Sequence, residues 1–195
     1  MTDTDVFWHW FAEQESYIHQ ELEQHPDAIA EAIATKLKTI HPDLVFDIPF
    51  ELENGKRQLI LSADGDASLF DLVFSLVDAA PDLPNWNFVA LRPRTNQADQ
   101  AIDLAGLYLE YEDIFFRITN DDLPLELEIY IRGYDNEDNR YVHGFFLLLD
   151  TLLGEYDAVT YTETVAIHPY DDEIEDLSRF ITLRDIFDER KQKKN

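Results

Sequence analysis

Residues 54–80, NGKRQLILSADGDASLFDLVFSLVDAA, contain a turn, a strand and a helix in immediate succession. Asn54-Gly55 favours the positive backbone angles of a type I′ turn, and the apolar run in 57–63 is typical of a strand. Asp64-Gly65-Asp66 ends that strand, and from 68 to 80 the apolar residues recur at helical spacing. This stretch therefore predicts a hairpin followed by a helix.

Upstream of the hairpin the period of the apolar residues is first helical and then two. Residues 5–23 and 27–40 have a helical pattern, with Pro26 between them, so two consecutive helices are expected in a helical N-terminal segment, 1–41. Residues 44–51 alternate between apolar and polar side chains, which indicates a strand with one buried face.

Downstream, strand and helix patterns continue to the end of the chain. Strands are expected over 86–91, 104–109, 113–119, 125–131 and 159–167, and helices over 141–153 and 178–191. Turn residues separate the middle strands, which predicts an antiparallel meander. The fold class predicted is α+β, with a mixed or largely antiparallel sheet, helices packed on it, two N-terminal helices and one C-terminal helix.

The length of 195 residues favours one domain, 1–195, that ends in a basic tail, 191–195. Aromatic residues make up 13% of the chain, which is more apolar material than a disordered chain contains. The chain has no cysteine and its N-terminus has no positive region ahead of an apolar stretch, so a cytoplasmic protein is expected. No apolar run is long enough for a membrane span.

The charge of the chain is strongly negative. Forty-one Asp and Glu residues against fifteen Lys and Arg give a formal charge of -26, which repels the phosphates of nucleic acids and anionic lipids. The expected partners therefore exclude nucleic acid and membrane and include a basic protein. Two alternatives remain open, because such a charge also serves solubility or adaptation to a salty cytoplasm.

The sequence contains no recognised catalytic or cofactor motif. It has no glycine-rich phosphate loop, no His-Glu-x-x-His and no Gly-x-Ser-x-Gly, and its six histidines form no ligand pair at helical spacing. Residues 135–140 have the composition of a calcium loop, but Arg140 occupies the sixth place, where glycine is required. No cofactor and no metal are therefore expected, and a binding protein is favoured over an enzyme.

Five residues are candidates for a ligand-binding site. Asp64 and Asp66 follow a strand, where two carboxylates could serve a cation or a proton transfer, although a turn and a helix cap account for them and are the favoured interpretation. Arg92 and Arg94 flank a proline near a strand end and could project together toward an anion, or pair with the abundant carboxylates of the chain. Trp86 opens the same strand and could anchor a ligand or lie in the core.

Three stretches together carry a resemblance to a known group of proteins. They are Phe7-Trp8-His9-Trp10-Phe11, the strand and turn from Leu59 to Gly65, and the segment from Ala80-Pro81 through Trp86 to Arg92-Pro93-Arg94, and Leu152-Leu153-Gly154-Glu155-Tyr156 fits the same pattern. The chain resembles an uncharacterised family of small acidic bacterial proteins. The resemblance implies no activity and no catalytic residue.

Two functions of different classes follow as hypotheses. The first is a cytoplasmic acidic protein-binding module, of the inhibitor or immunity type, for a basic partner. The second is a small-molecule binder or enzyme with a pocket near Asp64, Trp86, Arg92 and Arg94, because strand ends beside helices are usual pocket locations.

Overall fold

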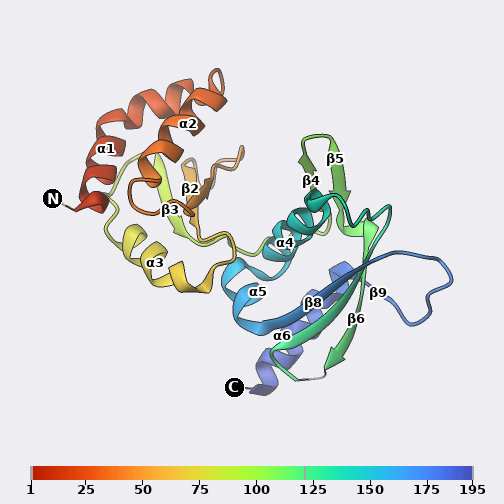
Figure 1. Cartoon of the computed structure of the whole chain (residues 1–195). Coiled ribbons are helices and arrows are strands. Elements are labelled where there is room, and N and C mark those ends of the chain that lie inside the picture. The colour runs from red at the N-terminus through yellow and green to blue at the C-terminus, as the bar shows by residue number, and fades with distance from the viewer. Residues whose placement is uncertain (1, 121, 195) are drawn as a thin grey trace. The chain divides into compact units, whose positions relative to one another are not determined.

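The computed structural model describes residues 2–120 and 122–194, except the side chain of Lys194. The chain contains both helices and strands, with helices at its two ends, and the strands form three separate sheets (Figure 1). The predicted α+β class is confirmed. The chain folds into two compact units, 1–92 and 93–195. The single domain expected from the length stays a prediction.

The first unit begins with two helices, α1 (Asp3–Glu21) and α2 (Pro26–Leu37). Pro26 is the first residue of α2, where its missing N–H leaves no helical bond unmade. The side chain of Thr2 and the carboxylate of Asp5 cap the start of α1 reciprocally. The two expected N-terminal helices are therefore confirmed.

A three-stranded sheet follows in the order β1-β2-β3, formed by β1 (Val45–Asp47), β2 (Arg57–Ser62) and β3 (Trp86–Ala90). Strands β1 and β2 are antiparallel, and their turn has the positive φ angles expected at Asn54 (52°) and Gly55 (81°). Strand β3 runs parallel to β2, because the short helices η1 (Ala67–Leu69) and α3 (Phe70–Asp78) carry the chain back across the sheet.

The core of the first unit lies between α1 and this sheet. The Trp8 indole N–H donates to the Leu76 carbonyl oxygen over 2.8 Å, so this tryptophan is anchored inside the core. The ring of Phe11 packs edge-on against Trp86, with centroids 5.1 Å apart. Edge-on aromatic pairs of this kind stabilise the core by more than the burial of their apolar area alone contributes.

The second unit contains a two-stranded and a four-stranded sheet. The two-stranded sheet consists of β4 (Ala101–Leu104) and β5 (Leu107–Glu110), and the four-stranded sheet has the order β8-β7-β6-β9. The strands of the larger sheet are β6 (Ile114–Asn120), β7 (Leu125–Ile131), β8 (Thr162–Pro169) and β9 (Ser178–Arg179). The helices of the second unit are α4 (Asn139–Leu153), α5 (Glu155–Tyr161) and α6 (Leu183–Lys194). It also contains two short 3-10 helices, η2 (Tyr111–Asp113) and η3 (Phe180–Thr182).

Three predicted elements of this unit are wrong in detail. The strand expected over 104–109 is a hairpin that turns at Ala105-Gly106, and it does not continue a meander into β6. The strand expected over 159–167 begins only at Thr162, because α5 precedes it, and it pairs with β7 in parallel. The segment 178–191 begins as strand β9, so the C-terminal helix starts later, at Leu183.

The second core is dominated by buried side chains of β6, β7 and α4. Phe145 and Leu148 of α4 are fully buried, and the Phe145 ring lies 5.7 Å from that of Phe180. Each unit thus has a core of its own. Within the described residues, no helix is long and apolar enough to cross a membrane.

Candidate functional site

The predicted site residues of the first unit lie at opposite ends of its parallel strands. Asp64 and Arg92 follow the carboxyl ends of the parallel strands β2 and β3, and the Arg92 guanidinium donates to Asp64 over 3.2 Å and to Asp47 over 2.8 Å. Trp86 begins β3 opposite Arg57, at the amino ends of the same strands. The sheet therefore brings Asp64 and Arg92 together and holds Trp86 away from them.

Asp66 serves the helix that follows. Its carboxylate accepts hydrogen bonds from the backbone N–H of Ser68 over 2.9 Å and from the Ser68 hydroxyl over 2.7 Å. These bonds from Ser68 hold the pKa of the Asp66 carboxyl below its ordinary value. This is the helix-cap arrangement that the turn chemistry also predicted.

Arg94 belongs to the second unit, and its partner is Asp188 of α6, to which both terminal nitrogens donate over 2.7 and 2.8 Å. Arg92, whose side chain is 11% exposed, has its carboxylate partners in the first unit. The structure therefore gives the two arginines different partners. Their common role toward an anion stays a prediction, and intramolecular pairing accounts for the contacts of both.

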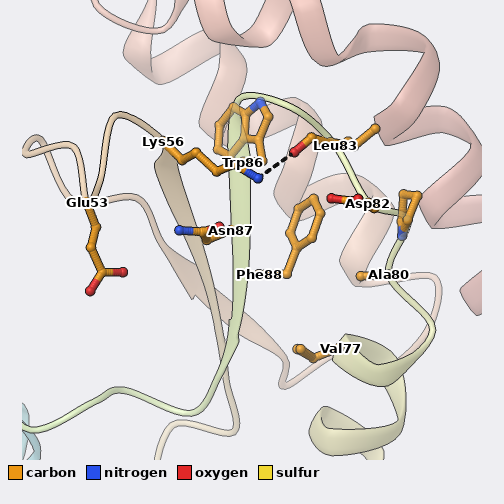
Figure 2. Close-up of a pocket in the computed structure, with 10 residues that line it drawn as sticks. Glu53, Lys56, Val77, Ala80, Asp82, Leu83, Trp86, Asn87 and Phe88 are labelled. Carbon is orange, nitrogen blue, oxygen red and sulfur yellow. Dashed lines mark hydrogen bonds between the residues drawn. The ribbon is translucent and has the colours of Figure 1, made fainter.

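A shallow groove of about 420 Å³ lies along β3 beside Trp86 (Figure 2). Its wall combines Trp86, Phe88 and Val77 with polar groups of Asn87 and Lys56. Figure 2 shows the Lys56 side chain reaching past β3 to the loop before it, where its ammonium donates to the Leu83 carbonyl oxygen over 3.2 Å. The lining also includes Glu53 and Asp82, and most of its accessible surface is polar, so the groove suits a polar small molecule.

A second hollow, of about 380 Å³, lies in the second unit at the β4–β5 hairpin. We call it the acidic hollow, and it is lined by Asp99, Gln100, Ala101, Tyr108, Glu110, Tyr111 and Glu112. In the part of the chain that the structure describes, none of its three carboxylates has a Lys, Arg or His side-chain partner. The Arg132 guanidinium donates to the backbone carbonyl oxygen of Glu112 over 3.3 Å, and the Glu110 side chain caps η2. The hollow therefore presents carboxylates that form no salt bridge within this described part.

The two tyrosines of the acidic hollow differ in exposure. Tyr108 is 62% exposed, so its ring is open to a partner, whereas Tyr111 is buried and its hydroxyl is hydrogen-bonded to the Thr151 hydroxyl over 2.8 Å. Burial raises the pKa of Tyr111 above its ordinary value, so the phenol remains neutral at physiological pH. Tyr111 thus forms a fixed floor and Tyr108 an accessible aromatic face.

The position of the hollow depends on contacts between the hairpin and α4. Gly144 of α4 faces the hairpin so closely that a Cβ there would lie 2.9 Å from Ile102 and 3.2 Å from Leu109. Arg140 donates to the backbone carbonyls of Leu104 and Ala105 and is itself paired with Asp138. These contacts fix the hairpin that carries Tyr108.

Comparison with known proteins adds no relative. No protein-family model matches this chain, and no curated protein or solved structure matches it. The function must therefore be inferred from the chemistry of the site.

The sequence does not single out the acidic hollow, because its residues come from a loop, two short strands and a turn. Asp99 and Glu112 are ordinary surface residues in a chain with 41 acidic side chains. Tyr108 lies in a segment whose pattern predicts one continuous strand, so its place beside a hairpin turn is not apparent from the sequence. Among the described residues, no group of three or more His, Asp or Glu side chains is arranged to hold a metal ion.

Proposed function

We propose that this chain is a cytoplasmic protein-binding module for a basic partner, of the inhibitor or immunity type. The observation that carries the proposal is the acidic hollow, where three carboxylates without a salt bridge among the described residues line the same space as an exposed tyrosine. A lysine or arginine side chain would find there both charge-assisted hydrogen bonds and an aromatic face. The rest of the surface supports the same partner, because both units are acidic.

The charge is distributed over the whole chain. The first unit has 17 acidic and 5 basic residues, and the second has 24 and 10, which gives net charges of -12 and -14. Such a field accelerates the encounter with a basic protein and opposes the approach of nucleic acid. The hollow would then supply the short-range contact that the field alone does not give.

The test compares two variants that lose the same charge from the same unit. The first is Asp99→Asn/Glu110→Gln/Glu112→Gln, and its matched control, Asp172→Asn/Glu173→Gln/Glu175→Gln, alters three exposed carboxylates outside the hollow. The tagged proteins are used to capture partners from the cell lysate at low and raised salt, and the affinity of the retained protein is then measured. We expect a basic partner that dissociates more readily as salt increases.

The two variants distinguish binding at the acidic hollow from attraction by the overall negative charge. If the hollow is the site, the first variant loses about tenfold or more in affinity, which corresponds to about 1.4 kcal/mol, and the control loses much less. Equal losses would mean that only net charge matters. A partner retained equally by all three proteins at every salt concentration would contradict the proposal.

The groove in Figure 2 favours a second candidate function, a small-molecule binder. Of the predicted site residues, Trp86 lines this groove, and Lys56 and Asn87 supply polar groups beside it. A metabolite screen by thermal shift should find a ligand whose affinity falls in Lys56→Ala and not in Lys38→Ala, an exposed lysine of the same unit. An unchanged affinity in Lys56→Ala would place that ligand elsewhere.

A further inference from the structure

A small pocket in the first unit contains a buried cation. Its volume is about 100 Å³, about three times the share of one water molecule in the liquid. We call it the Arg57 pocket, and it is lined by Leu22, Glu23, Pro26, Ile48, Pro49, Phe50 and Arg57. Five of these seven residues are apolar, so the pocket combines an aliphatic and aromatic wall with the guanidinium of Arg57 and the carboxylate of Glu23.

Arg57 is 5% exposed and is the first residue of β2, a strand with an apolar centre, Leu59-Ile60-Leu61. One terminal nitrogen donates to Glu23 over 2.5 Å, and the carboxylate of Glu23 is 63% exposed. The Nε–H of Arg57 is buried and has no acceptor among the described residues. The guanidinium has five N–H donors, so one exposed carboxylate leaves most of its donor capacity unused.

This arrangement is unfavourable for the empty protein. A buried charge destabilises the folded state unless hydrogen bonds and a counter-charge compensate for its lost hydration. Arg57 has a partial counter-charge in the exposed Glu23 carboxylate and, within the described residues, a buried Nε–H donor without an acceptor. A guanidinium satisfies its remaining donors best with a second carboxylate, because the two groups match in planar geometry.

Besides the exposed carboxylate of Glu23, exposed apolar side chains lie at this pocket. Phe50, which lines the pocket, is 86% exposed, and Leu52, two residues further along the same segment, is 52% exposed. An exposed phenylalanine beside an apolar hollow lowers its free energy when an apolar group covers it. The wall therefore selects an apolar group, and the guanidinium selects a carboxylate attached to it.

We propose that the Arg57 pocket binds a carboxylate that carries a short apolar group, such as a small branched-chain acid or the C-terminal residue of a polypeptide. The carboxylate bonds to Arg57 beside or in place of Glu23, and the apolar group enters the space between Leu22, Ile48 and Phe50. The proposal is independent of the acidic hollow, which belongs to the other unit.

The experiment titrates isovalerate into the full-length protein and follows the backbone amide signals by NMR. Shifts that saturate are expected at the pocket residues.

Arg57→Lys, which keeps the charge and loses the planar fork, should bind isovalerate about tenfold more weakly or worse. Glu23→Gln should bind more tightly, because a competing carboxylate has been neutralised. Phe50→Ala should weaken isovalerate binding, while the matched control Leu52→Ala, outside the lining, should not.

Two peptides that end in leucine, one with a free and one with an amidated C-terminus, identify the source of the carboxylate. A free-terminus peptide that binds more tightly than isovalerate indicates a polypeptide terminus, and tighter binding of isovalerate indicates a free acid. If the amidated peptide binds as tightly as the free-terminus peptide, the proposal is overturned. It is also overturned if neither isovalerate nor the free-terminus peptide gives saturable shifts. Phe50→Ala keeps the test decisive if Arg57→Lys fails to fold, because Phe50 is exposed and its removal leaves no cavity in the core.

Discussion

Arg94 and Asp188 show how this acidic chain uses its few basic side chains. The two donor nitrogens of Arg94 bond to the two carboxylate oxygens of Asp188, a bidentate pair that joins α6 to the start of the second unit. The hydrogen bond from Arg94 holds the pKa of Asp188 below its ordinary value. Arg92, Arg117 and Arg140 are likewise paired with carboxylates. These cations are paired with carboxylates of the same chain, so the remaining carboxylates dominate the surface charge.

The Asp188 pair predicts a pH dependence of stability. Because the folded-state pKa of Asp188 is lowered, its stabilisation is complete above the unfolded-state pKa, about 3.9 for an aspartate, and is lost as pH falls through the lower folded-state value. Asp188→Asn should therefore lower the free energy of unfolding at neutral pH, and its difference from the wild type should shrink below about pH 4. Urea unfolding at a series of pH values measures this difference.

Glu189→Gln is the control for that series. Glu189 lies on the same helix, is exposed and makes no side-chain hydrogen bond or ion pair with the described residues. The substitution should change the free energy of unfolding little at any pH. A difference between Asp188→Asn and the wild type that stays constant down to acid pH would contradict a depressed pKa.

Among the elements, the two hairpin turns explain one success and one failure of the sequence analysis. Both turns have paired positive φ angles, 52° and 81° at Asn54-Gly55 and 51° and 86° at Ala105-Gly106. Asparagine and glycine adopt this conformation readily and are recognised as a turn, whereas alanine is sterically disfavoured in it and gives no such signal. The first hairpin is therefore predictable from the sequence, and the pattern of the second predicts one strand.

Ala105→Asn should stabilise the second hairpin. The substitution reproduces the Asn-Gly pair that the chain uses at its other turn, and relief of the left-handed alanine is worth about 0.5–1 kcal/mol. The free energy of unfolding from urea titrations should rise by that amount. Asn54→Ala is the reverse control and should lower it by a similar amount. A loss of stability in Ala105→Asn would show that the Ala105 backbone is not strained.

Pairings between segments distant in the sequence are beyond the reach of these patterns. Periodicity places β2, β3, β6, β7 and α4 correctly, because each has a long apolar face. It does not show that β3 pairs with β2 in parallel, which separates Trp86 from Asp64 and Arg92 by the length of the strands. It also gives Arg57 no special role, because a lone arginine at the start of a strand is typical of a surface position, and only the structure shows it buried.

For the whole molecule, each of the two units must stay folded although the chain carries a total charge of -26. Repulsion between like charges destabilises the compact state of each unit, and salt weakens this repulsion. The Debye length falls from about 30 Å at 0.01 M salt to about 8 Å at 0.15 M, so most of the screening occurs within this range. A surface that attracts a basic partner and a surface adapted to high salt should differ in how the stability of the protein changes above this salt range.

The midpoint of thermal unfolding should therefore rise with potassium chloride up to a few hundred millimolar and then level off, because simple screening is then complete. Neutralising the exposed loop as Asp171→Asn/Asp172→Asn/Glu173→Gln/Glu175→Gln/Asp176→Asn should make the initial rise shallower, since five charges no longer repel their neighbours. Scanning calorimetry of both proteins over the salt series measures the two slopes. A continued steep rise to molar salt would favour salt adaptation as the origin of the charge, and a flat or falling curve would show that like-charge repulsion does not limit the stability of this fold.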